Sequence, residues 1–192
     1  MAGSALWMST TPPNEAALLA RARELDSRAL GLIHDRYYPE IYRYALYRTS
    51  DPALAEDIAG EAFLRLLDSL HQGRAPQTTL RGWLFSVASN LVVDHFRRAP
   101  RESAALDEDL PEAESSASRA EQNVQRQAVQ AAIRQLTAEQ QETLALRFGD
   151  GFSVEQTADV MGKSVTAVKA LQFRALAMLR KALGAGEVRH DG

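Results

Sequence analysis

Apolar residues recur every three or four positions along most of this 192-residue chain, and nowhere do they alternate at every second position. The first spacing puts apolar side chains on one face of an α-helix, whereas the second would indicate a β-strand. The pattern therefore predicts an all-α protein with no strands and no internal repeat. The expected helices cover about 30–48, 53–70, 80–98, 119–135, 138–148, 154–161 and 165–183.

Local signals fix several helix ends. The stretch TSDP at 49–52 ends one helix and starts the next, with Asp51 as N-cap and Pro52 at the first helical position. In LTAEQQ, Thr137 is the expected cap, with Gln140 or Gln141 near the third position. The Gly, Pro and Thr content of HQGRAPQTT predicts a loop over 71–79.

Composition divides the chain into two helical domains. Residues 99–118 are rich in Ala, Ser, Pro and acidic residues and contain only two large apolar side chains, so this stretch is expected to be a flexible linker. The first 14 residues include two prolines and no periodicity, which predicts a disordered leader. The expected organisation is a leader 1–14, a first domain 15–98, an acidic linker 99–118, a second domain 119–184 and a tail 185–192.

The segment SVEQTADVMGKSVTAVKALQFRALAMLRKAL at 153–183 predicts a helix-turn-helix. Two short amphipathic patterns meet at Gly162 and Lys163, with almost nothing between them. The second helix fits the major groove of DNA and is expected to face outward with Thr166, Lys169, Phe173 and Arg174. The alternative is that Phe173 covers a core and that Lys169 is ordinary surface.

Charge is unevenly distributed, which matters more to a DNA backbone than the net charge of −3. Acidic residues collect in 102–114, whereas 163–181 and the stretch HFRRAPR at 95–101 are basic. There is no cysteine, which excludes disulfides and thiolate metal sites and fits a reducing compartment. No apolar run is long enough to span a bilayer and no signal peptide is recognised, so we expect a cytoplasmic protein that does not insert into membranes.

No pattern of catalytic or metal-binding residues stands out. Asp57 and Glu61 lie one helical turn apart, and Asp94 and His95 are adjacent. A helical metal-dependent hydrolase using Asp57 and Glu61 is an alternative, but neither a third ligand nor a phosphate-binding loop accompanies the pair, and the four histidines are scattered. We therefore expect no enzymatic activity, no metal and no cofactor.

The two halves of the chain carry two motif sets in a characteristic order. DPALAEDIAGEAFLRLLDSL and LRGWLFSVASNLVVDHFRR are followed by the acidic stretch and then by LTAEQQETLALRFGDGFSVEQTADVMGKSVTAVKALQFRALAMLRKAL. Together they resemble the extracytoplasmic-function (ECF) sigma factors of bacterial RNA polymerase, members of the sigma-70 superfamily. The resemblance implies an alternative sigma factor that binds core RNA polymerase and directs initiation from promoters by their −10 and −35 elements. A stand-alone helix-turn-helix regulator is the alternative.

The resemblance also implies roles for individual residues of the first domain. The acidic helix would bind the β′ clamp helices of the polymerase, although Gly60 stands where the family usually has Gln. Its contacts would be Asp57, Glu61, Phe63 and Leu64. Contacts to the −10 element would be Leu70, His71, Trp83, Asn90, Asp94, Arg97 and Arg98.

Strand opening needs aromatic groups to receive unstacked bases, and Phe85 and Trp83 are candidates for that role, although a core position is expected to be the main role of Trp83. Loop 70–79 would capture a flipped base and is a few residues longer than in common members.

In the second domain, the resemblance assigns −35 contacts to the helix-turn-helix and a second polymerase contact to the β flap. Ala170 and Leu171 replace the more frequent Ser and Arg, which favours readout of DNA shape. The −35 contacts would be Ser164, Thr166, Lys169, Ala170, Phe173 and Arg174.

Two further expectations concern regulation. Members of this family are commonly held by an anti-sigma factor that wraps both domains, so such a partner is expected here. The acidic linker would either lie in the path of nascent RNA or serve only as a solubilising tether. Because a flexible tether does not fix two domains at promoter spacing, we expect the free protein to bind promoter DNA weakly.

Overall fold

The computed structural model describes residues 14–74, 76, 79–98 and 127–187, and all regular structure in these ranges is helical. This confirms the all-α prediction. The leader before Asn14, the linker 99–118 and residues 119–126 of the helix expected at 119–135 lie outside the described residues. In chain order, the helices include α1 Glu15–Arg23, α2 Ser27–Thr49, α3 Pro52–His71, α4 Leu80–Arg98, α6 Ala138–Leu144, η1 Ala145–Gly149, α7 Val154–Met161 and α8 Val165–Glu187.

Helix α1 was not expected from the sequence. Its N-cap is Asn14, whose side chain accepts a hydrogen bond from the Ala16 backbone NH, and the helix buries only Leu18 and Ala22. Glu15 ties α1 to the rest of the domain, because its carboxylate accepts hydrogen bonds from the Tyr37 hydroxyl (2.6 Å) and the Leu80 backbone NH (2.7 Å). A short helix is thus held against α2 and against the start of α4.

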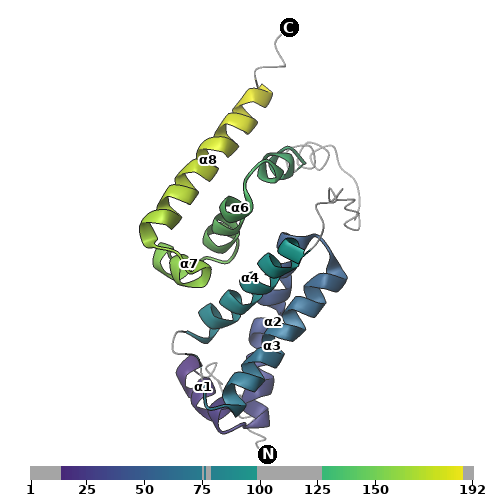
Figure 1. Ribbon diagram of the computed structural model, residues 1–192, viewed down its shortest axis with the longest axis vertical. Helices are drawn as coiled ribbons and strands as arrows, with labels where there is room; N and C mark the ends of the chain where they lie inside the picture. The colour runs from purple at the N-terminus through teal and green to yellow at the C-terminus, as the bar shows by residue number, and fades with distance from the viewer. Residues whose placement is uncertain (1–13, 75, 77–78, 99–126, 188–192) are drawn as a thin grey trace, which may run out of the picture.

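Helices α2, α3 and α4 form the body of the first domain (Figure 1). The predicted break between α2 and α3 is confirmed: Ser50 is left-handed, the Asp51 side chain caps the Leu54 NH at 3.1 Å, and Pro52 is the first residue of α3. Apolar side chains from all three helices make one core. Among the fully buried members are Ile33, Ile41, Leu66, Leu80, Leu84 and Val92.

The second domain begins, in the described part of the chain, with helical residues 127–134. Thr137 and Gln140 form the predicted capping box of α6. The chain is helical over the expected range to 148, but the prediction of one regular α-helix is corrected: from Ala145 the backbone widens into the π-helical η1, in which the Asp150 NH bonds the Ala145 carbonyl. The tail expected from 185 is also corrected, since α8 continues to Glu187.

The helix-turn-helix is present as predicted. Ser153 and Gln156 form a capping box at the start of α7, and Gly162 ends that helix at φ 61°. This left-handed conformation is one that glycine adopts without the steric penalty other residues bear. Helix α8 starts three residues later, with the Ser164 hydroxyl accepting from the Ala167 NH.

The two domains pack directly against one another. Helix α4 lies between the α2–α3 layer and α7, and Phe152 of the second domain meets Phe85 of α4 edge to face at 4.8 Å (Figure 1). Ala145, Leu146, Phe152 and Val160 therefore belong to the same buried cluster as the core of the first domain. The two expected domains are present, and they share this buried cluster.

Candidate polymerase and promoter interface

Helix α3 presents a polar stripe opposite its buried one. Asp57 is exposed, and the partly buried Glu61 accepts a hydrogen bond from Arg65 at 2.8 Å, one turn further along. Leu64 is 58% exposed, a large apolar side chain in solvent. Single exposed leucines are common, but this one stands beside the acidic pair, as expected for a protein contact.

Phe63 is held by aromatic neighbours on α2. Its ring lies 5.1 Å from that of His34 and 6.0 Å from that of Tyr38, and His34 stacks on Tyr38 at 4.8 Å. These contacts fix the ring of a half-buried side chain next to Leu64. All four residues expected to bind polymerase therefore lie on or beside one face of α3.

A groove of about 420 Å³ separates α3 from α4 and joins two residue sets that the sequence treats separately. Asp57, Glu61 and Arg65 line it from α3, and Asp94, His95 and Arg98 line it from α4. The groove thus carries acidic groups next to the basic end of α4. Residues expected to face polymerase and residues expected to face the −10 element therefore line the same groove.

The outer stripe of α4 holds the remaining −10 candidates. Asn90 is exposed, and Asp94 pairs with Arg97 at 3.0 Å. Trp83 is half-buried and packs against the core, consistent with its expected role as a core anchor. Arg98 is exposed at the end of the helix, where it lines the groove just described.

Three placements differ from the sequence-based expectation. Leu70 is 4% exposed and Phe85 is fully buried, so both side chains belong to the core and do not face DNA. The reason is the helical register: both residues fall on the apolar stripe of their helix. His71 is exposed as expected, but it is the last residue of α3 rather than part of the loop, with Nδ1 3.0 Å from the Leu67 carbonyl oxygen.

Sequence reasoning missed two exposed apolar residues near the end of α4. Val93 and Phe96 are each 48% exposed, and the Phe96 ring contacts that of His95 at 5.5 Å. Val93 falls off the apolar stripe of the helix while remaining apolar. Phe96 continues the stripe of Phe85, Ser89 and Val92 but lies one turn beyond Val92, the last buried residue of α4. Phe96, rather than Phe85, is the aromatic side chain of this helix available to stack on an unpaired base.

Helix α8 presents the −35 candidates on its outer face. Ser164, Thr166, Lys169 and Arg174 are exposed, and Phe173 is 75% exposed. Ala170 is half-buried. Lys163 in the turn is paired with Glu139 at 2.7 Å, so the free positive charge of this surface comes from α8 itself.

Comparison with known proteins follows the same division of the chain. Residues 33–102 match the sequence model of sigma-70 region 2, and residues 126–179 match that of sigma-70 region 4. The chain is 31% identical over 160 residues to the ECF RNA polymerase sigma factor SigX of Bacillus subtilis. This alignment covers 78% of this chain and 81% of SigX. This chain is an ECF sigma factor.

A second relative of this sigma factor is the ECF RNA polymerase sigma factor BldN of Streptomyces coelicolor, 36% identical over 174 residues. The alignment covers 86% of the sigma factor described here and spans 64% of BldN.

Solved structures agree on the fold. CnrH, in complex with the cytosolic domain of CnrY, superposes with a TM-score of 0.67 over 89% of this chain and 97% of CnrH, at 23% identity. RpoE of Bartonella quintana, in complex with the anti-sigma factor NepR, gives 0.60 over 79% of this chain and 94% of RpoE, at 22% identity. The predicted family and the predicted fold are both confirmed for this sigma factor.

Proposed function

We propose that this ECF sigma factor binds core RNA polymerase through the α3 face and reads promoters through α4 and α8. The observation that supports this most strongly is the groove between α3 and α4, which joins Asp57 and Glu61 to Asp94 and Arg98 in a member of the sigma factor family. The α3 carboxylates suit a basic partner surface, and the β′ clamp helices are the partner that the family provides. The second domain contacts the β flap.

In promoter recognition, Asn90, Arg97 and Arg98 contact the −10 region, and Phe96 and the exposed His71 flank the opened strand. Exposed positive charge at the end of α4 suits a nucleic-acid backbone, and a free aromatic ring suits an unstacked base. At the −35 element, Lys169 and Arg174 contact phosphates or base edges, and Phe173 offers an apolar contact to thymine methyl groups.

An anti-sigma factor controls the protein. The support is the family membership together with the structures of CnrH with CnrY and of RpoE with NepR. An apolar groove of about 510 Å³ between the domains, bordered by the exposed Tyr47 and Phe148, offers a surface for such a partner. The protein acts in the cytoplasm, where the polymerase is, and no described helix is long and apolar enough to cross a membrane.

The protein catalyses no reaction in this proposal. In the described ranges, no group of three or more acidic or histidine side chains is arranged to hold a metal ion. Asp57 and Glu61 line an open groove in which Arg65 already pairs with Glu61. A titration with Mg²⁺, Mn²⁺ or Zn²⁺ that showed stoichiometric binding would favour the hydrolase alternative.

Run-off transcription from a genomic fragment library tests the proposal. We expect new transcripts with core polymerase plus this protein, and we expect their loss with Asp57→Ala/Glu61→Ala. The matched control is Glu56→Ala/Asp68→Ala, which removes two exposed carboxylates of α3 that do not line the groove. No transcripts, together with sequence-specific DNA retention by the protein alone, would instead identify a stand-alone regulator.

A further inference from the structure

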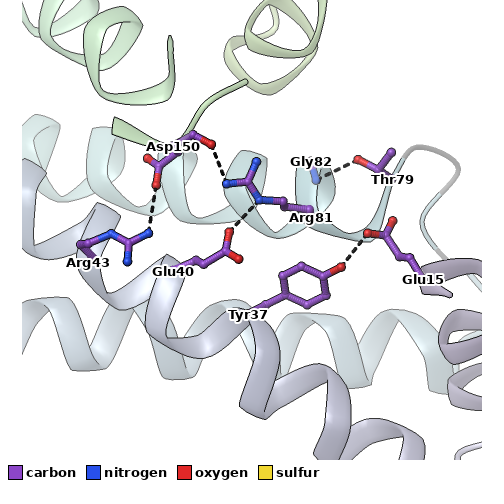
Figure 2. Close-up of polar contacts among 8 residues, drawn as sticks. All are labelled: Glu15, Tyr37, Glu40, Arg43, Thr79, Arg81, Gly82 and Asp150. Atoms are coloured by element: carbon purple, nitrogen blue, oxygen red, sulfur yellow. Dashed lines mark hydrogen bonds and ion pairs between the residues drawn. The ribbon is translucent and has the colours of Figure 1, made fainter. Parts of the chain in front are cut away.

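Polar contacts hold the first turn of α4 from three directions (Figure 2). The three consecutive residues 80–82 are tied to α1, to α2 and to the residue that precedes α4. The contact to α2 is the ion pair of Arg81 with Glu40, whose Nε and carboxylate oxygen lie 2.6 Å apart. The side chains that hold this turn, directly or through one another, are called the α4 anchor: Glu15, Tyr37, Glu40 and Thr79.

Glu15 is the member of the α4 anchor that joins three helices. One carboxylate oxygen accepts a hydrogen bond from the Leu80 backbone NH at 2.7 Å, and the other accepts one from the Tyr37 hydroxyl at 2.6 Å (Figure 2). Leu80 is the first residue of α4, so its NH has no partner within the helix. Because Leu80 is fully buried and Tyr37 is 1% exposed, both donors rely on the same carboxylate rather than on water.

Tyr37 remains a hydrogen-bond donor at neutral pH. Burial raises the pKa of its hydroxyl, and the hydrogen bond to Glu15 together with the charge of that carboxylate raises it further. On its other side, Glu15 faces the first NH groups of α4, where the helix dipole favours a negative charge. Glu15 therefore lies between a hydroxyl donor and the positive end of a helix.

The second cap of this turn depends on a glycine. The Thr79 hydroxyl accepts a hydrogen bond from the Gly82 NH at 3.1 Å (Figure 2). A Cβ at Gly82 would lie 2.9 Å from the Thr79 hydroxyl oxygen, which is closer than such atoms approach in proteins. Any larger residue at this position would therefore displace the cap. The start of α4 thus has two caps of different origin, Glu15 from α1 and Thr79 from the chain before the helix.

Helix α1 is itself fixed at both of its ends. Its buried residues, Leu18 and Ala22, belong to the core that α1 shares with α2 and α3. Beyond its last turn, Asp26 caps α2 and pairs with Arg21 at 2.6 Å. At its first turn, Glu15 reaches α4. A helix that buries only two side chains is thereby placed to determine where α4 begins.

The anchored turn lies next to the surface proposed to read the −10 element. Trp83 follows the turn directly, and Asn90 lies about 10 Å further along the helix at 1.5 Å per residue. The loop 70–79, which the family resemblance implies in capturing a flipped base, ends at Thr79. Because base contacts require placement to within about 0.5 Å, a small displacement of this turn affects recognition.

We propose that Glu15 is a positioning residue for −10 recognition, which fixes the start of α4 through the Leu80 NH and Tyr37. This inference rests on the proposed function, because it takes the −10 element as the target of α4. Without the carboxylate, the Leu80 NH and the Tyr37 hydroxyl lose their acceptor, and the first turn of α4 shifts or frays to find another. Binding of core polymerase, proposed for α3, does not require this turn.

The rate of promoter opening by reconstituted holoenzyme tests this role. The template is a promoter mapped by run-off transcription, together with a library of variants of its −10 sequence. At saturating holoenzyme, Glu15→Ala should lower the rate of opening about threefold to tenfold, the range expected for loss of a helix cap. It should also reduce the discrimination between −10 bases. The affinity for core polymerase should remain that of the wild type.

A double-mutant cycle separates positioning from a general loss of stability. Because Tyr37 acts on this turn through Glu15, Tyr37→Phe should slow opening in the wild-type background but not in the Glu15→Ala background. Glu15→Gln keeps an oxygen acceptor for the Leu80 NH and should restore part of the rate. Gly82→Ala displaces the Thr79 cap and should reproduce the loss of −10 discrimination from the other side of the turn.

Two substitutions on α1 are the matched controls. Arg21→Gln removes the pair with Asp26, which is largely solvated and contributes little, and Glu24→Ala removes an exposed carboxylate at the end of the helix. Both should leave the rate of opening and the −10 preference at the wild-type values. Circular dichroism at the assay temperature verifies that each variant is folded.

The outcomes distinguish this role from the proposed function. A wild-type rate and a wild-type −10 preference in Glu15→Ala would overturn the positioning role while leaving a working sigma factor. A parallel loss of core binding and opening with unchanged −10 preference would also overturn it, because a destabilised fold behaves in this way, and so would additive effects of Tyr37→Phe and Glu15→Ala. Absence of any transcript with the wild-type protein would overturn the proposed function and the positioning role together.

Discussion

At the scale of single residues, the carboxyl group of Asp150 opposes the contact between the two domains. Its backbone carbonyl helps to form that contact by accepting a hydrogen bond from Arg81. Burial raises the pKa of its carboxyl, and Arg43 (3.7 Å away) and Arg81 offset this effect only in part, while Glu40 adds to it. An acid whose pKa is raised in the docked state favours docking fully at pH values below its ordinary pKa and loses that contribution as the pH rises through the raised value. Ionised Asp150 therefore weakens docking at neutral pH.

Asp150→Asn should consequently favour the docked arrangement of the two domains at neutral pH, which a shorter distance between spin labels on α2 and α8 would show. The difference from wild type should shrink as the pH falls, because a protonated Asp150 is as neutral as asparagine. Comparing the variant with wild type at each pH cancels the titration of the other carboxylates. A shift toward longer distances would contradict this account.

Two phenylalanines of the second domain should respond differently to truncation. Phe173 is 75% exposed, so Phe173→Ala should change the free energy of unfolding by less than about 0.5 kcal/mol but weaken promoter recognition by about 1 kcal/mol, roughly fivefold. Phe152 is 2% exposed, so Phe152→Ala should cost about 3–5 kcal/mol of stability. Urea unfolding and transcription from a mapped promoter distinguish the two effects, and a strongly destabilised Phe173→Ala would place that ring in the core instead.

At the scale of elements, two glycines occupy helix positions of opposite character. Gly60 lies inside α3 with open space where a Cβ would be, so Gly60→Ala should stabilise the protein by up to about 1 kcal/mol. Gly162 ends α7 at φ 61°, a conformation that alanine adopts only with strain. Gly162→Ala should therefore lower the free energy of unfolding of the protein by about 1 kcal/mol. Thermal unfolding measures both, and equal signs for the two variants would contradict the argument.

The periodicity and the cap residues were sufficient to predict most helices from the sequence. α3, α7 and α8 each carry an apolar stripe. Asp51 marks the start of α3, and Gly162 marks the end of α7. α1 was missed because it buries only Leu18 and Ala22, too few positions to establish a period. The π-helical η1 was missed because it continues the apolar pattern of α6 and differs only in its hydrogen bonding.

The exposure of candidate site residues was predicted where it follows from helical phase, as for Asn90, Asp57 and Lys169. Leu70 and Phe85 were misplaced because family position and chemical type do not report burial. The sequence carries no pattern that predicts the contact between the two domains, since Arg81 and Glu142 have the charge and spacing of surface residues on separate helices. Only the packing of the two domains brings their partners within hydrogen-bond distance.

At the scale of the whole molecule, the second domain depends on the first for its core. Among the described residues, its separate cluster of buried apolar side chains consists of Leu136, Leu144 and Ala175, with Leu179 packed against it, whereas Leu146 and Phe152 are buried in the shared cluster. Free wild-type protein should therefore unfold in one cooperative transition, and Arg81→Gln should separate it into two, with the second domain unfolding first.

Two probes follow this separation in urea. Both tryptophans, Trp7 and Trp83, precede the second domain, so fluorescence reports on the first domain while circular dichroism reports on both. The two signals should coincide in wild type and in Arg21→Gln and diverge in Arg81→Gln. Divergence already in wild type would mean that the domains are energetically independent.

The proposed recognition face of α8, held close to that of α4, would also affect how the free protein moves on the chromosome. Each encounter engages one face at a time, so each complex has the short lifetime of a single weak contact, and the protein exchanges rapidly between sites. Promoters are then not blocked by unassembled factor, and the pool that competes for polymerase stays in rapid equilibrium with DNA. The residence time at a promoter becomes long only after assembly, so the commitment to transcribe is a kinetic property of the holoenzyme.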